Sequence, residues 1–147
     1  MNTIRVARTT RIPCSAAELY AWHERPGALE RLAPPWERAR VLERTGGIEN
    51  GSTVTLEVHA GPVAVRWVAR HRDVVPGREF TDEQVSGPFA LWVHLHRMIP
   101  IDHASCDLEE RVEFAPPFGA LGAPAVPVLR SKVERMLAYR HRVIADD

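Results

Sequence analysis

Hydrophobic and polar residues alternate with a period of two over most of the chain, which predicts β-strands. The first such segment, residues 3–12, has apolar markers at Ile4, Val6 and Ile12 and stops at Pro13. Six further segments alternate in the same way and are separated by residues typical of short turns. They span residues 41–44, 53–60, 63–70, 78–85, 89–99 and 105–114. The short connections predict antiparallel hairpins.

Two short helices are predicted between the first strand and the second. Ser15 is a suitable N-cap, and Glu18 three residues later completes a capping box. Residues 23–25 interrupt this helix, and Pro26 can then begin a second one that continues through Leu32.

The last part of the chain has a different character. Residues 115–127 hold four prolines and two glycines, and we expect a rigid, apolar loop there that serves as a lid or rim. Beyond it, residues with a spacing of three and four predict a long amphipathic helix. They are Val128, Leu129, Val133, Met136, Leu137, Arg140 and Ile144.

This element order predicts an α+β fold in a single domain, residues 1–147. A curved antiparallel sheet of about seven strands would wrap around the C-terminal helix, with the two short helices after the first strand. One helix cannot fill so large a concave face, so we expect an internal cavity between sheet and helix. Such cavities are usually apolar with a few placed polar groups.

Composition narrows the classes of partner. The 147 residues are 45% hydrophobic and 26% charged, which is ordinary for a globular protein. Nineteen basic residues balance nineteen acidic ones, so no general attraction to nucleic acid is expected. No apolar run is long enough to insert in a membrane, and no signal-peptide pattern is present. We therefore expect a cytoplasmic protein with reduced cysteines; the oligomeric state stays open.

Three stretches resemble the START/Bet v 1 (SRPBCC) helix-grip superfamily, which includes polyketide cyclase/dehydrase-like and coenzyme Q-binding proteins. They are residues 13–22 (PCSAAELYAW), residues 80–89 (FTDEQVSGPF) running into 92–96 (WVHLH), and residues 113–116 (EFAP) together with the Arg-rich last helix. The second stretch is similar to a bacterial subgroup, some members of which are fused to sugar-epimerase-like proteins. The resemblance implies a helix-grip fold and binding of a small hydrophobic or amphipathic molecule, sometimes with chemistry.

The candidate site follows from side chains that share one face of a strand. Trp92, His94, His96 and Met98 point one way, and we expect that way to be inward. Neighbouring strands and the last helix would complete the lining. The predicted ligand-binding residues are Trp67, Phe80, Asp82, Gln84, Trp92, His94, His96, Met98, Glu110, Phe114, Phe118, Val133, Met136 and Leu137.

Several roles are open for His94 and His96. They would orient a ligand carbonyl or hydroxyl, act as a general base with Asp82 as partner, or be structural and satisfied by Asp82 or Gln84. A His-x-His pair on a strand also suits a metal, but spacing offers no third ligand, so no metal is predicted. Cys106 is expected to be an inert thiol.

The resulting hypothesis is a protein that binds a small hydrophobic or amphipathic ligand, such as a lipid, a quinone or a polyketide-like molecule, in an internal cavity between the sheet and the last helix. The alternative is an aromatase/cyclase- or dehydratase-type enzyme that uses a cavity histidine and a carboxylate. A third hypothesis is an accessory module that acts through its surface. No cofactor-binding motif is present, so no cofactor is expected. Arg130, Arg135, Arg140 and Arg142 are expected on the solvated side of the last helix.

Overall fold

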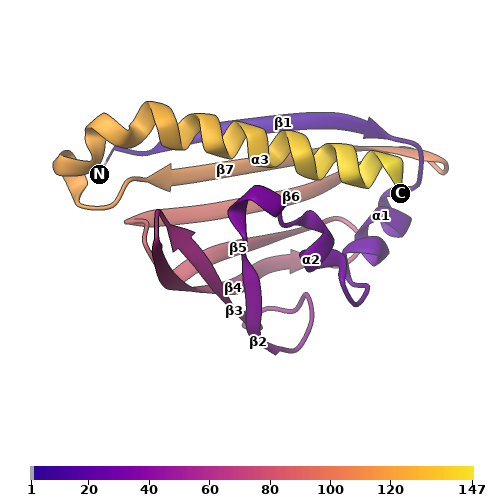
Figure 1. Cartoon of the computed structure of the whole chain (residues 1–147). Helices are drawn as coiled ribbons and strands as arrows, with labels where there is room; N and C mark the ends of the chain where they lie inside the picture. Colours follow the sequence, from indigo (N-terminus) through magenta and orange to yellow (C-terminus); the bar gives the residue numbers. More distant parts are fainter. Residues whose placement is uncertain (1) are drawn as a thin grey trace.

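Seven antiparallel strands form one sheet in the computed structural model of the chain, which describes residues 2–147 (Figure 1). The spatial order is β1-β7-β6-β5-β4-β3-β2, so the first two strands of the sequence lie at opposite edges. The strands are β1 Ile4–Ile12, β2 Arg40–Thr45, β3 Thr53–Ala60, β4 Val63–Val75, β5 Glu79–Ser86, β6 Leu91–Asp102 and β7 Ser105–Ala115. The predicted sheet is confirmed.

Helical segments occupy the two remaining parts of the chain. After β1 come α1 (Ala16–His23), α2 (Ala28–Leu32) and the 3-10 turn η1 (Pro35–Glu37); after β7 come η2 (Gly119–Ala125) and α3 (Val126–Asp146). The predicted cap forms, because the Glu18 backbone N–H donates to Oγ of Ser15 at 3.1 Å. Residues 115–127, expected to be a rigid, apolar loop, contain the 3-10 segment η2 and the first residues of α3.

Strand β4 continues to Val75, beyond the expected end at residue 70. The pairing with β5 shifts register between Arg72 and Val75, and Asp73 adopts a left-handed φ of 53° in that interval. An extra residue of this kind bends a strand without ending it. The sheet therefore curves here instead of stopping.

The helix α3 runs along β1 and β7, and α1 and α2 lie beside its C-terminal half (Figure 1). The interior contains two apolar clusters. One includes Ile12, Leu19, Tyr20, Phe80, Met98, Leu108 and Ile144, and the other Val6, Trp92, Val112, Phe114, Val133 and Leu137. Between them, β6 and β7 place polar side chains on the same concave face. Among the described residues, no helix is both long and apolar enough to cross a bilayer.

Candidate functional site

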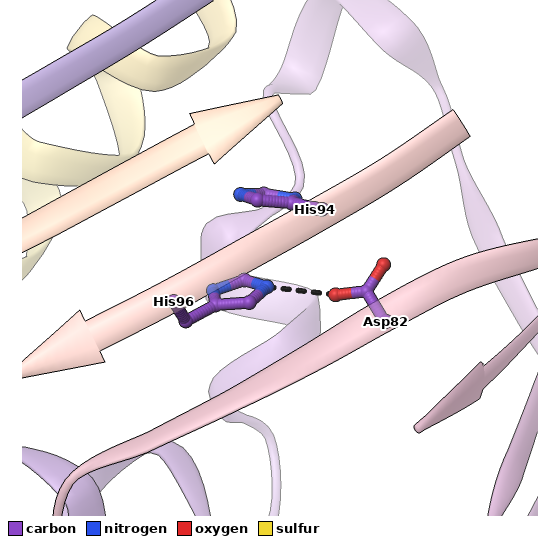
Figure 2. A group of neighbouring side chains, drawn as sticks. All are labelled: Asp82, His94 and His96. Carbon is purple, nitrogen blue, oxygen red and sulfur yellow. Dashed lines mark hydrogen bonds and ion pairs between the residues drawn. The ribbon is translucent and has the colours of Figure 1, made fainter. Parts of the chain in front are cut away.

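Strand β6 places His94 and His96 inside the protein. Buried and less buried residues alternate from Leu91 to Met98, and the buried set is Trp92, His94, His96 and Met98. The predicted inward face of this strand is therefore confirmed. The two imidazole rings stack, with centroids 3.9 Å apart and an interplanar angle of 24° (Figure 2).

Asp82 on β5 is the hydrogen-bond partner of His96. The register pairs Phe80 with His96 and Asp82 with His94, so all four side chains share one face. Nε2 of His96 donates to Oδ2 of Asp82 at 2.7 Å (Figure 2). The Phe80 ring stacks on the other side of His96 at 4.3 Å. These contacts fix the orientation and the tautomer of His96.

Glu110 on β7 is fully buried and lies at the centre of the polar residues. Its Oε2 accepts a hydrogen bond from Nε2 of His94 at 2.5 Å and another from Nε of Arg140 at 3.0 Å. Nη2 of Arg140 is also 3.4 Å from Nδ1 of His96. We call Asp82, His94, His96, Glu110 and Arg140 the imidazole–carboxylate cluster.

Arg140 corrects one expectation, because it was placed on the solvated side of the last helix. Its residue is 7% exposed, and it points inward. Arg140 follows Leu137 by three positions and precedes Ile144 by four, so it lies on the apolar face of α3. A guanidinium can be buried there because Glu110 supplies a carboxylate directly opposite.

Two further histidines border the cluster and were missed from the sequence. His141 on α3 is buried; its Nδ1 lies 2.7 Å from Oγ1 of Thr10, and its Nε2 lies 3.4 Å from Oε1 of Glu110. His141 follows Leu137 by four positions, and that spacing was the available signal.

His23, at the end of α1, was taken only as part of a helix break. Its Nδ1 donates to the carbonyl of Leu19 at 2.8 Å, which leaves Nε2 as a hydrogen-bond acceptor. Within residues 2–147, this buried Nε2 has no hydrogen-bond partner. The His23 ring lies 6.3 Å from that of His96 and 5.8 Å from that of Phe80.

The surroundings of the site shift the pKa values of two carboxylates, Asp82 and Glu110, and of two imidazoles, His96 and His23. Burial acts to raise the pKa of Asp82, but the hydrogen bond from His96 and the nearby His94 lower it to about 2. Burial also acts to raise the pKa of Glu110, but Arg140, the nearby His141 and the hydrogen bond from His94 hold it well below its usual range. Burial lowers the pKa of His96 to about 3 and that of His23 to about 4. At neutral pH both carboxylates are therefore charged, and both of these rings are neutral.

Neutral imidazoles beside ionised carboxylates can donate, accept or move a proton. The same residues also supply a potential third metal ligand that spacing alone did not reveal. Ligand atoms of Asp82, His94 and His96 lie within 4.8 Å of one another. However, His96 and Asp82 are hydrogen-bonded to each other at 2.7 Å, which is too close for two ligands of one ion. A metal would require these side chains to separate.

A hollow of about 530 Å³ opens between α2 and strands β2 and β3. Its lining comprises Leu29, Glu30, Ala33, Ala39, Arg40, Val41, Arg44 and Leu56. None of the predicted ligand-binding residues belongs to this lining. Leu56 nevertheless pairs with Trp67 across the sheet, Trp67 contacts Trp92 at 5.0 Å, and Trp92 precedes His94 on the same face.

The model of the polyketide cyclase/dehydrase and lipid transport family matches residues 12–139. The chain belongs to this family. No curated protein matches the sequence significantly.

Several solved structures have the same fold as this chain. The Zhui aromatase/cyclase from Streptomyces sp. R1128 is 17% identical, with a TM-score of 0.78 over 99% of this chain and 93% of that one. A START superfamily protein from Mycobacterium smegmatis is 14% identical, with a TM-score of 0.69 over 97% and 94%. A nucleoside-diphosphate sugar epimerase from Corynebacterium glutamicum is 24% identical, with a TM-score of 0.73; the match covers 96% of this chain but 28% of that one. The predicted superfamily and helix-grip fold are confirmed.

In this member of the polyketide cyclase family, the other predicted site residues have several placements. Trp92, Phe114, Val133 and Leu137 form one apolar cluster, and Trp67 and Met136 pack against it. Phe80 and Met98 belong to the other cluster.

Two predicted residues of this family member lie apart from the cluster. Gln84 does not contact either histidine of β6, because its side chain makes two hydrogen bonds to the backbone of Phe89. Phe118 is 82% exposed and points away from the interior.

Proposed function

We propose that this chain is a single ligand-binding domain, residues 1–147, for a small amphipathic molecule. A carbonyl or hydroxyl group of the ligand would bind at the imidazole–carboxylate cluster and His23. Its apolar body would extend along Trp92 and Trp67 toward the hollow at α2. A lipid, a quinone or a polyketide-like molecule has this combination of groups, and we place the protein in the cytoplasm.

The observation that carries this proposal is the acceptor nitrogen of His23. A buried polar atom without a partner is costly, because it has lost its hydrogen bonds to water. Nε2 of His23 is such an atom, and the lowered pKa of the ring keeps it an unprotonated acceptor at neutral pH. A ligand hydroxyl would donate to it.

The hollow at α2 supports the apolar part of the proposal. Its volume of about 530 Å³ falls within the range of small-molecule sites. Leu29, Ala33, Val41 and Leu56 supply apolar surface, and Arg40 and Arg44 lie in the same lining. An amphipathic molecule fits such a lining better than a highly polar one.

Binding can be tested with a decanoate, a naphthoquinone and a polyhydroxylated anthraquinone, using native mass spectrometry and thermal unfolding. We expect at least one probe to form a 1:1 adduct and to raise the Tm with increasing concentration, because it binds only the folded state. His23→Phe should lower the affinity for that probe about tenfold, because it removes one hydrogen bond of about 1.4 kcal/mol. His23→Gln, which keeps an acceptor, is the matched control. The proposal fails if no probe binds, or if His23→Phe binds the probe as tightly as the wild type does.

A second candidate function is proton transfer in an aromatase/cyclase-type reaction. The supporting observation is that a neutral His23, held by the Leu19 carbonyl, lies beside the hydrogen-bonded His96 and Asp82. A neutral imidazole with a free ring nitrogen can accept a proton from an enolisable carbon between two carbonyls. If so, His23→Gln should lower kcat for a poly-β-ketone by about 10²-fold or more with its Kd nearly unchanged. Equal loss of binding and turnover would assign His23 to recognition alone.

A further inference from the structure

A second hollow, of about 260 Å³, lies where η1 meets α3 and the turn between β3 and β4. It shares no residue with the imidazole–carboxylate cluster or with the hollow at α2. Its lining includes Trp36, Glu37, Arg38, His59, Lys132 and Arg135. The family relationship and the proposed function assign nothing to this place.

The lining has an excess of positive charge, although the whole protein has none. Arg38, Lys132 and Arg135 contribute three cations against the one carboxylate of Glu37. Lys132 is the only lysine of the sequence.

None of these three cations forms an ion pair within the part of the chain that the structure describes. Most other arginines of the surface do; one example is Arg130, which lies 3.4 Å from Glu134 on the same helix. Cations gathered around a hollow without carboxylate partners are typical of a site for an anion.

Two of the cations, Lys132 and Arg135, lie on the same side of α3. Lys132 and Arg135 are three residues apart on α3 and therefore lie on the same face of the helix. The Arg135 guanidinium lies over the Trp36 ring, 5.0 Å from its centroid. Trp36 itself packs edge-on against Tyr139 at 5.3 Å, so this stack is held against α3.

Two other residues of the lining, Arg38 and His59, add independent features. Arg38 follows η1 with a left-handed φ of 51°, a conformation uncommon for a residue with a side chain. Nδ1 of His59 is buried and has no hydrogen-bond partner within residues 2–147. The residue that carries this nitrogen therefore belongs to the same lining as the three cations.

We propose that this hollow binds the phosphate group of a small phosphate monoester. Three cations and Glu37 leave a local charge of about +2, which matches the charge of about −1.5 to −2 that a monoester carries at neutral pH. Arginine and lysine donors suit phosphate oxygens, and His59 adds a further polar side chain to the lining. The partly exposed face of Trp36 offers a surface for the organic group of the ester. This site is independent of the ligand proposed for the interior.

Isothermal titration calorimetry at low ionic strength tests the site, with phenyl phosphate and inorganic phosphate as probes and phenol as the uncharged control. We expect saturable binding of phenyl phosphate that weakens with added salt. Lys132→Met and Arg135→Gln should each weaken it about tenfold, because each removes a charge-assisted contact. Glu37→Gln should tighten it, since it removes the opposing carboxylate. Arg130→Gln, on the same helix but outside the hollow, should leave binding unchanged.

The two probes separate the sources of affinity. Equal affinity for inorganic phosphate and phenyl phosphate would assign binding to the phosphate alone, whereas tighter binding of the ester would show that Trp36 contributes. The proposal is overturned if neither probe binds saturably. It is also overturned if Arg130→Gln weakens binding as much as Lys132→Met does, or if Ala33→Phe in the hollow at α2 abolishes binding.

Discussion

Arg140 on α3 and Glu110 on β7 form a buried ion pair, with Nε of the arginine 3.0 Å from Oε2 of the glutamate. Residues thirty positions apart thereby join the C-terminal helix to β7, the strand next to the β1 edge of the sheet. The same carboxylate receives the hydrogen bond of His94, so the pair also fixes the orientation of a cluster imidazole.

This pair makes a stability prediction. Arg140→Met should lower the free energy of unfolding by about 3–5 kcal/mol, because it leaves the Glu110 carboxylate buried without its cation. Urea unfolding measures the change. Adding Glu110→Gln to Arg140→Met should recover part of the loss. Arg130→Met, whose partner Glu134 is exposed, should cost no more than about 0.5 kcal/mol. Equal effects of the two single arginine variants would contradict this account.

Stability should fall as the solution becomes acidic. The folded-state pKa values of His96 and His23, about 3 and about 4, lie below the ordinary value of 6.5. From pH 6.5 down to about 4, the unfolded chain therefore binds protons that the folded chain does not. The loss from His23 alone is on the order of 3 kcal/mol.

Asp82 also makes the folded state less stable as the pH falls, but over a lower pH range. Its pKa of about 2 lies below the ordinary 3.8, so its contribution is present above pH 3.8 and is lost as the pH falls toward 2. Urea titrations between pH 7.5 and 4 measure the histidine part. His23→Gln should flatten the pH dependence, whereas His103→Gln, in the exposed turn between β6 and β7, should retain it. A stability independent of pH across this range would exclude neutral buried imidazoles.

Filling the hollow at α2 should block the proposed ligand without unfolding the protein. Ala33 lines the hollow, and Ala33→Phe adds a ring to a space of about 530 Å³. We expect the affinity for the best probe to fall at least tenfold while the Tm without ligand changes by only a few degrees. Ala7→Phe, at an exposed position of β1, is the control for the added ring. Full binding by Ala33→Phe would show that the ligand body lies elsewhere.

The two thiols should differ in reactivity. Cys106 is fully buried, and burial raises the pKa of its thiol to about 11, from an ordinary 9.0, which lowers the thiolate fraction about a hundredfold. Cys14 is partly exposed. Iodoacetamide at pH 8 should modify native Cys106 much more slowly than Cys14, and both should react in guanidinium. Peptide mass spectrometry reads each site, and rapid native labelling of Cys106 would contradict an inert role.

The fold was predictable because alternation along each strand is a local property. Turn residues such as Gly51, Gly61 and Gly77 mark the ends of the strands, and the structure gives all three a positive φ. The inward face of β6 followed from the positions of Trp92 and Met98 around the two histidines. The pairing of His96 with Asp82 then followed from the adjacency of β5 and β6.

The rest of the site depends on contacts between distant segments. Arg140 resembles the solvated arginines of α3 in sequence, and only the buried carboxylate of Glu110 explains its inward orientation. His23 lies near His96 because α1 packs against β6, and no local sequence pattern predicts this packing. The position of the hollow depends on sheet curvature, and the bulges of β4 that set this curvature have no clear sequence mark.

The sheet order has a consequence for how this protein can diversify. Because β1 and β2 lie at opposite edges, the connecting residues 13–39 make no ladder contacts within the sheet and cross from one side of the molecule to the other (Figure 1). They carry His23, the α2 wall of the larger hollow, and the Trp36 and Arg38 wall of the smaller one. One contiguous segment thus reaches three places where a ligand would bind, while β3 lines both hollows through Leu56 and His59. Replacing that segment alone would change ligand preference and leave every strand pairing intact.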